Sequence, residues 1–95
     1  VTDRGALPLV MLRDRHAGPH TPQVAADKAY TALSFKIETL ALEAVTRTEP
    51  AMAGIRHVPR VVAVGGGVPI ASAGSQVGSI GVSGAPGGAA DEECA

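Results

Sequence analysis

A chain of 95 residues with a formal net charge of −1 is long enough for one small domain, and its charge excludes a surface built for nucleic acid or an anionic membrane. One Tyr, one Phe and no Trp exclude a core of aromatic side chains, so Val, Leu, Ile and Ala must fill it. No apolar run approaches the ~20 residues of a membrane span, no signal peptide is visible, and the lone Cys94 excludes an intramolecular disulfide.

The N-terminal part of the chain predicts two strands joined by a turn. Residues 3–5, Asp-Arg-Gly, have the composition of a turn. Val1 would then be the last residue of one strand, and residues 7–12 would form the next. Pro8 favours an edge position or a bulge in that second strand.

A first helix is predicted over residues 22–35. Thr21 suits the N-cap and Pro22 the first helical position, and alanines at helical spacing give a flat face that can lie on a sheet. Lys28 lies on the neighbouring, half-apolar stripe. A lysine there is more often a snorkelling side chain than a ligand contact, and both interpretations stay open.

A second, shorter helix is predicted over residues 40–47, with Thr39 as its cap and Pro50 beyond its end. Glu38 and Glu43 are interpreted as solvated charges on its surface. Residues 51–60 then form a connector.

The glycine-rich stretch from residue 61 to 88 predicts three consecutive strands, at residues 61–64, 68–72 and 76–83. Ala73-Gly74 favours a hairpin turn between the second and third strands. Glycines inside the last strand usually mark a close approach by another backbone or a ligand, so we expect any functional site to lie near this hairpin. Acids at residues 91–93 suit the first turn of a closing helix.

Familiar catalytic motifs are absent. The sequence has no dinucleotide-binding or phosphate-loop glycine motif, no cysteine pair and no zinc-protease motif. Ser83 lacks the context of a nucleophile elbow and is expected simply to close its strand.

Three loop histidines are candidate ligands: His16, His20 and His57. An isolated loop histidine is most often an exposed side chain without a function. His20 is the best exception, because prolines stiffen its loop and it lies at the mouth of a helix. A neutral imidazole can ligate a metal, haem iron included. Arg13, Arg15 and Lys28 are close enough in sequence to pair with carboxylates of a ligand.

Three stretches of this chain resemble the GlcG/HbpS family, which includes the C-terminal domain of PduO-type proteins. They are ADKAYTA at residues 26–32, GGGVPI at 65–70, and GSIGVSGAPGG at 78–88 followed by Asp-Glu at 91–92. The resemblance implies an α/β (α+β) profilin-like fold, an antiparallel sheet flanked by helices, in homo-oligomers that are often octamers. Some members bind haem, and some are linked to haem degradation or corrinoid metabolism. Compared with a full-length member, residues 1–95 are expected to form a single domain that is incomplete at both termini.

The resemblance makes a haem-binding protein our first hypothesis, with His20 as the iron ligand and a possible role in haem or corrinoid handling. The residues assigned to the haem site are Arg13 and Lys28 as propionate partners, Thr21 beside His20, Tyr30 and Thr31 as pocket walls, and Gly65, Gly66 and Gly67 as a loop that lets the ligand approach the backbone. Two alternatives stay open. One is an enzyme or accessory protein for a small 2-hydroxy or 2-oxo acid held by Lys28 and Arg13, and the other is a structural oligomer module without a ligand.

Overall fold

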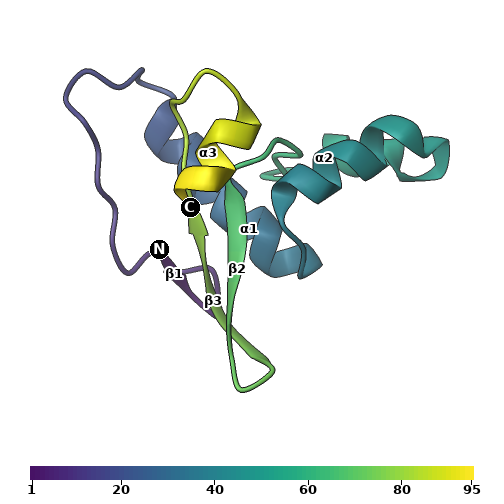
Figure 1. The fold of residues 1–95 in the computed structure, drawn as a ribbon, viewed down its shortest axis with the longest axis horizontal. Helices are drawn as coiled ribbons and strands as arrows, with labels where there is room; N and C mark the ends of the chain where they lie inside the picture. The colour runs from purple at the N-terminus through teal and green to yellow at the C-terminus, as the bar shows by residue number, and fades with distance from the viewer.

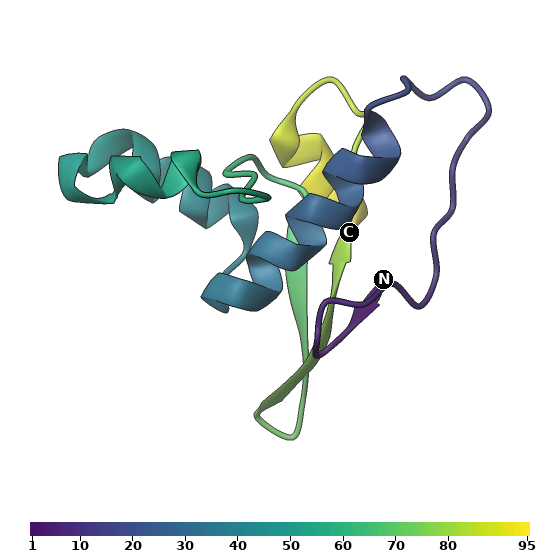
Figure 2. The same ribbon diagram turned by 180° about the vertical axis from the view of Figure 1, so that it is seen from behind.

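A computed structural model describes all 95 residues as a three-stranded antiparallel sheet with helices around it (Figure 1). The elements are, in chain order, β1 (Thr2–Asp3), α1 (Thr21–Phe35), α2 (Thr39–Thr48), the 3-10 helix η1 (Pro50–His57), β2 (Gly67–Ser72), β3 (Ser75–Gly81) and α3 (Gly88–Cys94). The strand order is β1-β3-β2. Helix α1 covers one face of the sheet, and α3 lies on the other side near one end of the strands (Figures 1 and 2). The predicted α+β class is therefore confirmed.

The hairpin of β2 and β3 forms where the sequence predicts it. The two strands pair from Gly67 opposite Gly81 to Ser72 opposite Ser75. Ala73 and Gly74 join them with φ angles of 51° and 78°. Two successive positive φ angles are the signature of a turn whose twist matches that of the flanking strands.

The strand predicted at residues 61–64 is wrong. The backbone N–H of Val62 donates to Thr31 Oγ1 of α1 at 3.0 Å, and that of Val61 donates to the Val58 carbonyl at 3.1 Å. A helix side chain and a turn thus satisfy amides that a neighbouring strand would otherwise have bonded. The connector predicted at residues 51–60 is largely the 3-10 helix η1.

The strand predicted at residues 7–12 is also wrong, and Val1 does not end a strand. Pairing is limited to β1 and one isolated bridge between Thr2 and Pro8. The amides of Leu9 and Val10 both bond the Val1 carbonyl, so the segment folds back on the chain start rather than along the sheet. Figure 1 shows it swinging out in a wide loop before α1, and Leu12 is 90% exposed.

Small residues let α1 lie directly on the sheet. A Cβ atom at Gly81 would collide with the Ala25 carbonyl oxygen of α1, and it would lie 2.9 Å from the Ala29 nitrogen. Ser79, fully buried in β3, donates its hydroxyl hydrogen to the Ala29 carbonyl at 2.7 Å. The glycines of β3 therefore mark a close approach by another backbone, which is one of the two causes that such glycines indicate.

The core contains more polar than apolar residues. The buried apolar residues are Ala29, Ala32, Leu42 and Ala63. The buried polar residues are Thr2, Thr21, Lys28, Thr31, Thr39, Thr46, Ser79 and Asp91. Every buried side-chain nitrogen and oxygen has a hydrogen-bond partner, as the high cost of an unpaired buried polar group requires. No helix has the length and apolar character that crossing a membrane requires.

Candidate functional site

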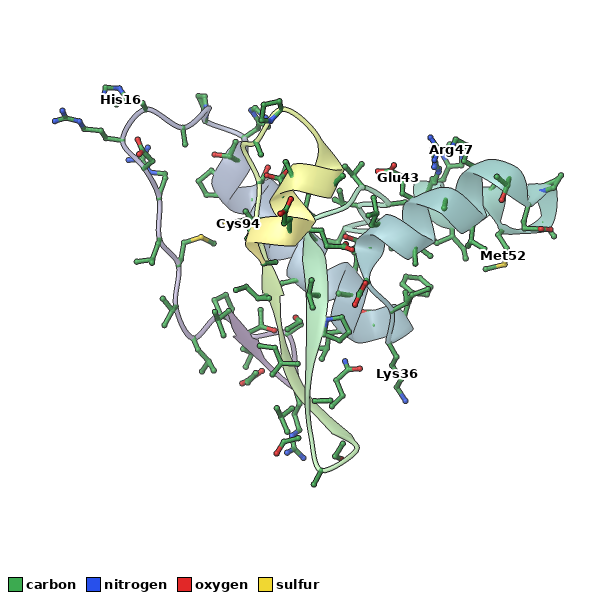
Figure 3. The ribbon with its side chains drawn as sticks, in the orientation of Figure 1. His16, Lys36, Glu43, Arg47, Met52 and Cys94 are labelled. Atoms are coloured by element: carbon green, nitrogen blue, oxygen red, sulfur yellow. The ribbon has the colours of Figure 1, made fainter.

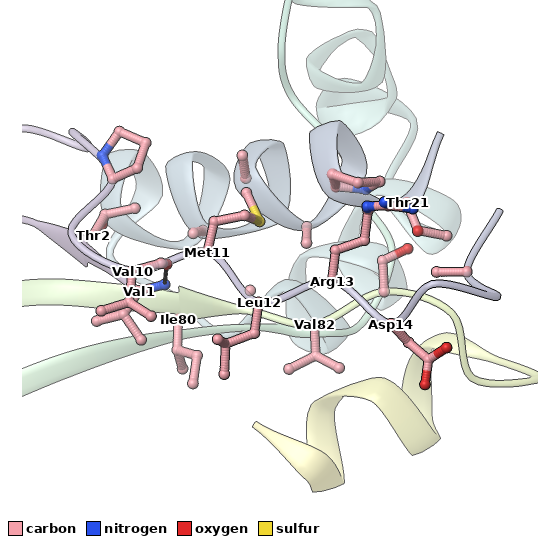
Figure 4. Close-up of a pocket in the computed structure, with 18 of the residues that line it drawn as sticks. Val1, Thr2, Val10, Met11, Leu12, Arg13, Asp14, Thr21, Ile80 and Val82 are labelled. Atoms are coloured by element: carbon pink, nitrogen blue, oxygen red, sulfur yellow. Dashed lines mark hydrogen bonds between the residues drawn. The ribbon is translucent and has the colours of Figure 1, made fainter. Parts of the chain in front are cut away.

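Two adjoining hollows lie where the N-terminal segment, the start of α1 and the end of β3 meet. The first, the apolar cavity, has a volume of about 380 Å³ and is lined chiefly by Val1, Val10, Met11, Leu12, Ile80 and Val82. In Figure 4 the Met11 side chain extends toward α1, whereas those of Leu12, Ile80 and Val82 point away from that helix. The second, the polar cleft, has a volume of about 780 Å³ and includes His16, His20, Lys28, Gly84, Gly88 and Asp91. The two hollows share the residues Asp14, Ala17, Thr21 and Ser83.

The structure places His20 in the polar cleft, directly at the start of α1. His20 is the N-cap residue and its side chain makes no capping hydrogen bond to the helix. The ring packs on Gly18, where an added Cβ atom would lie 2.9 Å from His20 Cε1. His20 is thus an exposed imidazole at the helix mouth, next to the wall that the polar cleft shares with the apolar cavity.

Thr21 does not cap α1, contrary to the prediction. It is the first residue of the helix, and its hydroxyl donates to the Gly18 carbonyl at 2.8 Å. Because that bond closes the loop before the helix, His20 is held at the N-cap. Thr21 lines both hollows, as its predicted place beside the ligand would require.

The other histidines differ from His20 in their surroundings. His16 also lines the polar cleft, but its Nε2 accepts a hydrogen bond from Arg15 Nε at 3.3 Å. In Figure 3 it lies at the outer edge of the N-terminal loop. His57 ends η1 and lines neither hollow.

Arg13 and Lys28, the two predicted carboxylate partners, do not come together. Arg13 lines the apolar cavity and in Figure 4 extends toward Thr21. Lys28 is 2% exposed on the floor of the polar cleft. Its Nζ donates to Asp91 Oδ2 at 2.9 Å and to the Val82 carbonyl at 3.0 Å. Lys28 is therefore not a snorkelling side chain but half of a buried ion pair between α1 and α3.

The path of Lys28 explains the middle glycine of the triple-glycine loop. A Cβ atom at Gly66, whose φ is 132°, would lie 2.8 Å from Lys28 Nζ. The Val82 N–H donates to the Gly66 carbonyl at 2.9 Å, so the lysine passes beside the last bond that joins these two segments. Only glycine leaves room for the buried ammonium there.

The sequence predicts Gly65–Gly67 as a loop that lets a ligand approach the backbone. In the structure, side chains of the protein itself accept hydrogen bonds from all three loop amides. Gly65 N–H donates to Glu43 Oε1 at 3.2 Å, Gly66 N–H to Glu92 Oε1 at 3.4 Å, and Gly67 N–H to Thr39 Oγ1 at 2.8 Å. The sequence predicts Thr39 as the cap of α2, but it is the first residue of that helix, and Glu38 is the N-cap. Glu43 is not simply a solvated charge. The loop lines neither the apolar cavity nor the polar cleft.

Tyr30 and Thr31 do not line these hollows, contrary to the prediction. Thr31 is fully buried, and its hydroxyl donates to the Asp27 carbonyl at 2.7 Å while accepting from Val62 N–H. The Tyr30 ring lies 4.1 Å from the Arg60 guanidinium carbon in a cation–π contact. Both residues are thus occupied by contacts with residues 60–62 and do not form walls of either hollow.

Asp91 is the site residue that the sequence interpretation missed. It lies 63 residues from Lys28, and its place in a short acidic run suggests only a helix-end charge. The available signal was Lys28 itself, since a lysine on the sheet-facing side of a helix needs a carboxylate partner if it is buried. No group of three or more His, Cys, Asp and Glu side chains is arranged to hold a metal ion.

Comparison with known proteins identifies the family. The family described as "Haem degrading protein HbpS-like" matches residues 1–95. The crystal structure of a double mutant of Streptomyces reticuli HbpS superposes with a TM-score of 0.85 at 36% identity, over 96% of this chain and 60% of that one. A search of curated proteins gives no match.

Two further solved structures share the fold. Klebsiella pneumoniae protein ORFY, of the DUF336 family, has a TM-score of 0.88 at 26% identity, over 96% of this chain and 63% of that one. A protein named PduOC, solved as a haem complex, has a TM-score of 0.86 at 28% identity, over 97% of this chain and 67% of that one. This chain thus spans about 60% of the length of HbpS. The match over residues 1–95 shows that the chain belongs to the HbpS-like family.

Proposed function

We propose that this protein binds haem in the apolar cavity, with His20 as the ligand of the iron. The observation that carries the proposal is that the apolar cavity adjoins a cleft containing His20, whose side chain makes no capping hydrogen bond to the helix. Apolar walls with a few polar groups are typical of cofactor sites. The HbpS-like membership and the haem complex of PduOC support the same ligand.

The residues around the apolar cavity fit the two chemically different parts of haem. Met11, Leu12 and Val82 offer apolar contact to a macrocycle. Arg13, on the same cavity, offers a guanidinium to a propionate carboxylate. Bound haem would supply a redox-active iron whose electronic state depends on its axial ligand.

Lys28 has a supporting rather than a direct role in this proposal. Its ammonium is already bonded to Asp91 and to the Val82 carbonyl. A propionate partner at Lys28 would have to displace a buried carboxylate, whereas Arg13 is exposed and needs no displacement. Arg13 and Lys28 line different hollows, which weighs against a small 2-hydroxy or 2-oxo acid held by both residues.

Self-association is part of the proposal. Leu7, Leu9 and Leu12 are 66%, 65% and 90% exposed beside the apolar cavity, and burying them against another copy would remove apolar surface from water. Light scattering over a range of concentrations would then give a homo-oligomer, and a monomer at every concentration would refute this part.

The experiment that tests haem binding is a haemin titration followed by absorbance. We expect the wild-type protein to bind haemin and His20→Ala to change the spectrum of the complex more than its affinity, because the apolar contacts remain while the axial ligand is lost. His16→Ala and His57→Ala are the controls: the first removes the other imidazole of the polar cleft, and the second removes one remote from both hollows.

The outcomes separate the parts of the proposal. A wild-type protein that gives no haemin complex refutes haem binding and brings the small-acid and ligand-free hypotheses forward. A spectrum changed by His16→Ala and not by His20→Ala moves the iron ligand to His16 and keeps the function. A spectrum unchanged by all three variants refutes histidine ligation.

A further inference from the structure

Helix α3 borders every hollow in the molecule. Cys94 lines the apolar cavity, Gly88 and Asp91 line the polar cleft, and Ala89, Glu92 and Glu93 line a third hollow of about 390 Å³ beside α2. Figures 1 and 2 show α3 on the side of the sheet opposite α1, at the end of the strands where the site lies. A movement of α3 would therefore change all three openings together.

Two carboxylates hold α3 in place. Asp91 Oδ2 accepts from Lys28 Nζ at 2.9 Å, and Glu92 Oε1 accepts from the Leu40 N–H at 2.8 Å and the Gly66 N–H at 3.4 Å. A further close contact is backbone against backbone, between Gly88 and Gly65. The alanines Ala89 and Ala90 are exposed, so apolar burial adds little to the attachment.

The segment that leads into α3 contains two unconstrained glycines and is tied to the helix at one point, because the Ala85 N–H donates to Asp91 Oδ1 at 2.8 Å. Gly84 has a φ of 121° and only a Thr21 methyl group, at 4.0 Å, near its would-be Cβ atom, and Gly87 has nothing within 4 Å. Neither glycine is there to make room for a neighbour. Gly84 precedes the bond between Ala85 and Asp91, so it is the point about which residues 85–94 can turn as one unit.

We propose that α3 is a lid, hinged at Gly84 and latched by Asp91 and Glu92. The structure shows the closed state, in which the lid completes the wall of the polar cleft and reaches the apolar cavity. Opening breaks the Glu92 bonds to Leu40 and Gly66 and the pair of Asp91 with Lys28, whereas the bond between Ala85 and Asp91 moves with the helix. Opening then gives a ligand access to both hollows without unfolding the sheet.

Hydrogen exchange of the protein without haem tests the lid. Glu92→Ala removes the latch, and Glu93→Ala is the matched control, because Glu93 is the exposed neighbour on the same helix and makes no hydrogen bond. The reporter amides are those of Asp91 and Ala95, which bond the carbonyls of Gly87 and Asp91 within α3. A helix of seven residues is too short to keep these bonds once it leaves the protein, so opening of the lid exposes both amides to exchange. We expect Glu92→Ala to accelerate their exchange about tenfold, with β3 amides unchanged and Glu93→Ala without effect.

Three results would overturn the lid: unchanged exchange in Glu92→Ala, equal acceleration by Glu93→Ala, or equal acceleration in β3, which would mean that α3 does not open by itself. Should Glu92→Ala fail to fold, Glu92→Gln takes its place: its neutral amide oxygen accepts a weaker hydrogen bond than the carboxylate does, so a smaller acceleration confined to α3 is expected.

A second measurement rests on the proposed haem binding. Glu92→Ala should raise the rate of haemin association several-fold and leave the final spectrum unchanged, because the lid gates entry and does not touch the iron ligand. An unchanged rate with accelerated exchange would refute gating of haem. If the wild-type protein binds no haemin, the proposed function fails, and the exchange data alone decide whether the lid exists.

Discussion

Removing one partner of the Lys28–Asp91 pair should destabilise the fold far more than removing both. The side chains are 3% and 5% exposed and their charged atoms lie 2.9 Å apart. At an effective dielectric constant of about 20 the attraction is about 6 kcal/mol, comparable with the several kcal/mol that it costs to desolvate two ions. The pair is thus nearly neutral as a whole, whereas either ion alone keeps its desolvation penalty without its partner.

The perturbation is a double-mutant cycle of Lys28→Met, Asp91→Asn and the double variant, followed by urea denaturation. Each single variant should lose about 3–5 kcal/mol of the free energy of unfolding, and the double variant should lose less than the worse single variant. Arg60→Met is the control: Arg60 pairs with Asp27 at 3.1 Å and lies over the Tyr30 ring, but its side chain is 49% exposed, so the loss of both contacts should stay within about 2 kcal/mol.

Two results would refute this account of the ion pair. One is single variants that lose no more than Arg60→Met does, which would mean that water screens the pair. The other is a double variant whose loss equals the sum of the two single losses, which would mean that the charges are not coupled. A single variant that is unfolded without urea agrees with the prediction provided that the double variant folds, since 3–5 kcal/mol is a large share of a small domain's stability.

The remaining predictions concern packing and one buried amide. Gly81→Ala should lower the free energy of unfolding, measured by urea denaturation, by about 1–3 kcal/mol because the added methyl group meets the α1 backbone. Gly54→Ala is the control, since nothing lies within 4 Å of its added Cβ atom, and it should change this free energy by less than about 0.5 kcal/mol. Equal effects of the two variants would mean that α1 and β3 are not in direct contact. Thr39→Val should lower the free energy of unfolding by about 1–3 kcal/mol because it leaves the Gly67 amide without an acceptor. Thr48→Val, on the exposed end of α2, is the control and should leave stability nearly unchanged. A Thr39→Val variant as stable as the wild type would contradict the buried hydrogen bond.

Local patterns predicted the elements whose hydrogen bonds are local. The hairpin turn at Ala73-Gly74 follows from two residues that accept positive φ, and α1 follows from Pro22 and the run of alanines. The strand prediction for residues 61–64 failed because their β-branched composition is typical of a strand. The hydrogen bond from Val62 to Thr31 spans 31 residues, and the local sequence pattern does not indicate it.

The candidate site was predicted only in part, for the same reason. His20 stands out because its surroundings are set by adjacent residues, and the structure keeps it in a cleft. The partners of Lys28 and of the loop amides come from α3 and α2, far along the chain, so sequence reasoning assigned an open ligand site to groups that the protein itself fills. Resemblance to the family supplied the fold, and it could not say which polar groups were already paired.

The polar character of the core affects how the stability of the fold depends on temperature. Exposing apolar surface on unfolding raises the heat capacity and exposing polar surface lowers it, by about 0.45 and 0.26 cal/mol/K per Å² respectively. Threonines, Ser79 and the Lys28–Asp91 pair outnumber the apolar residues among the buried side chains of this fold. The heat-capacity change per residue should therefore fall below the usual ~12–15 cal/mol/K, and the stability curve should be flatter than that of an apolar core of equal size. A protein with such a curve loses little stability on cooling and holds a similar margin over a wide range of temperature.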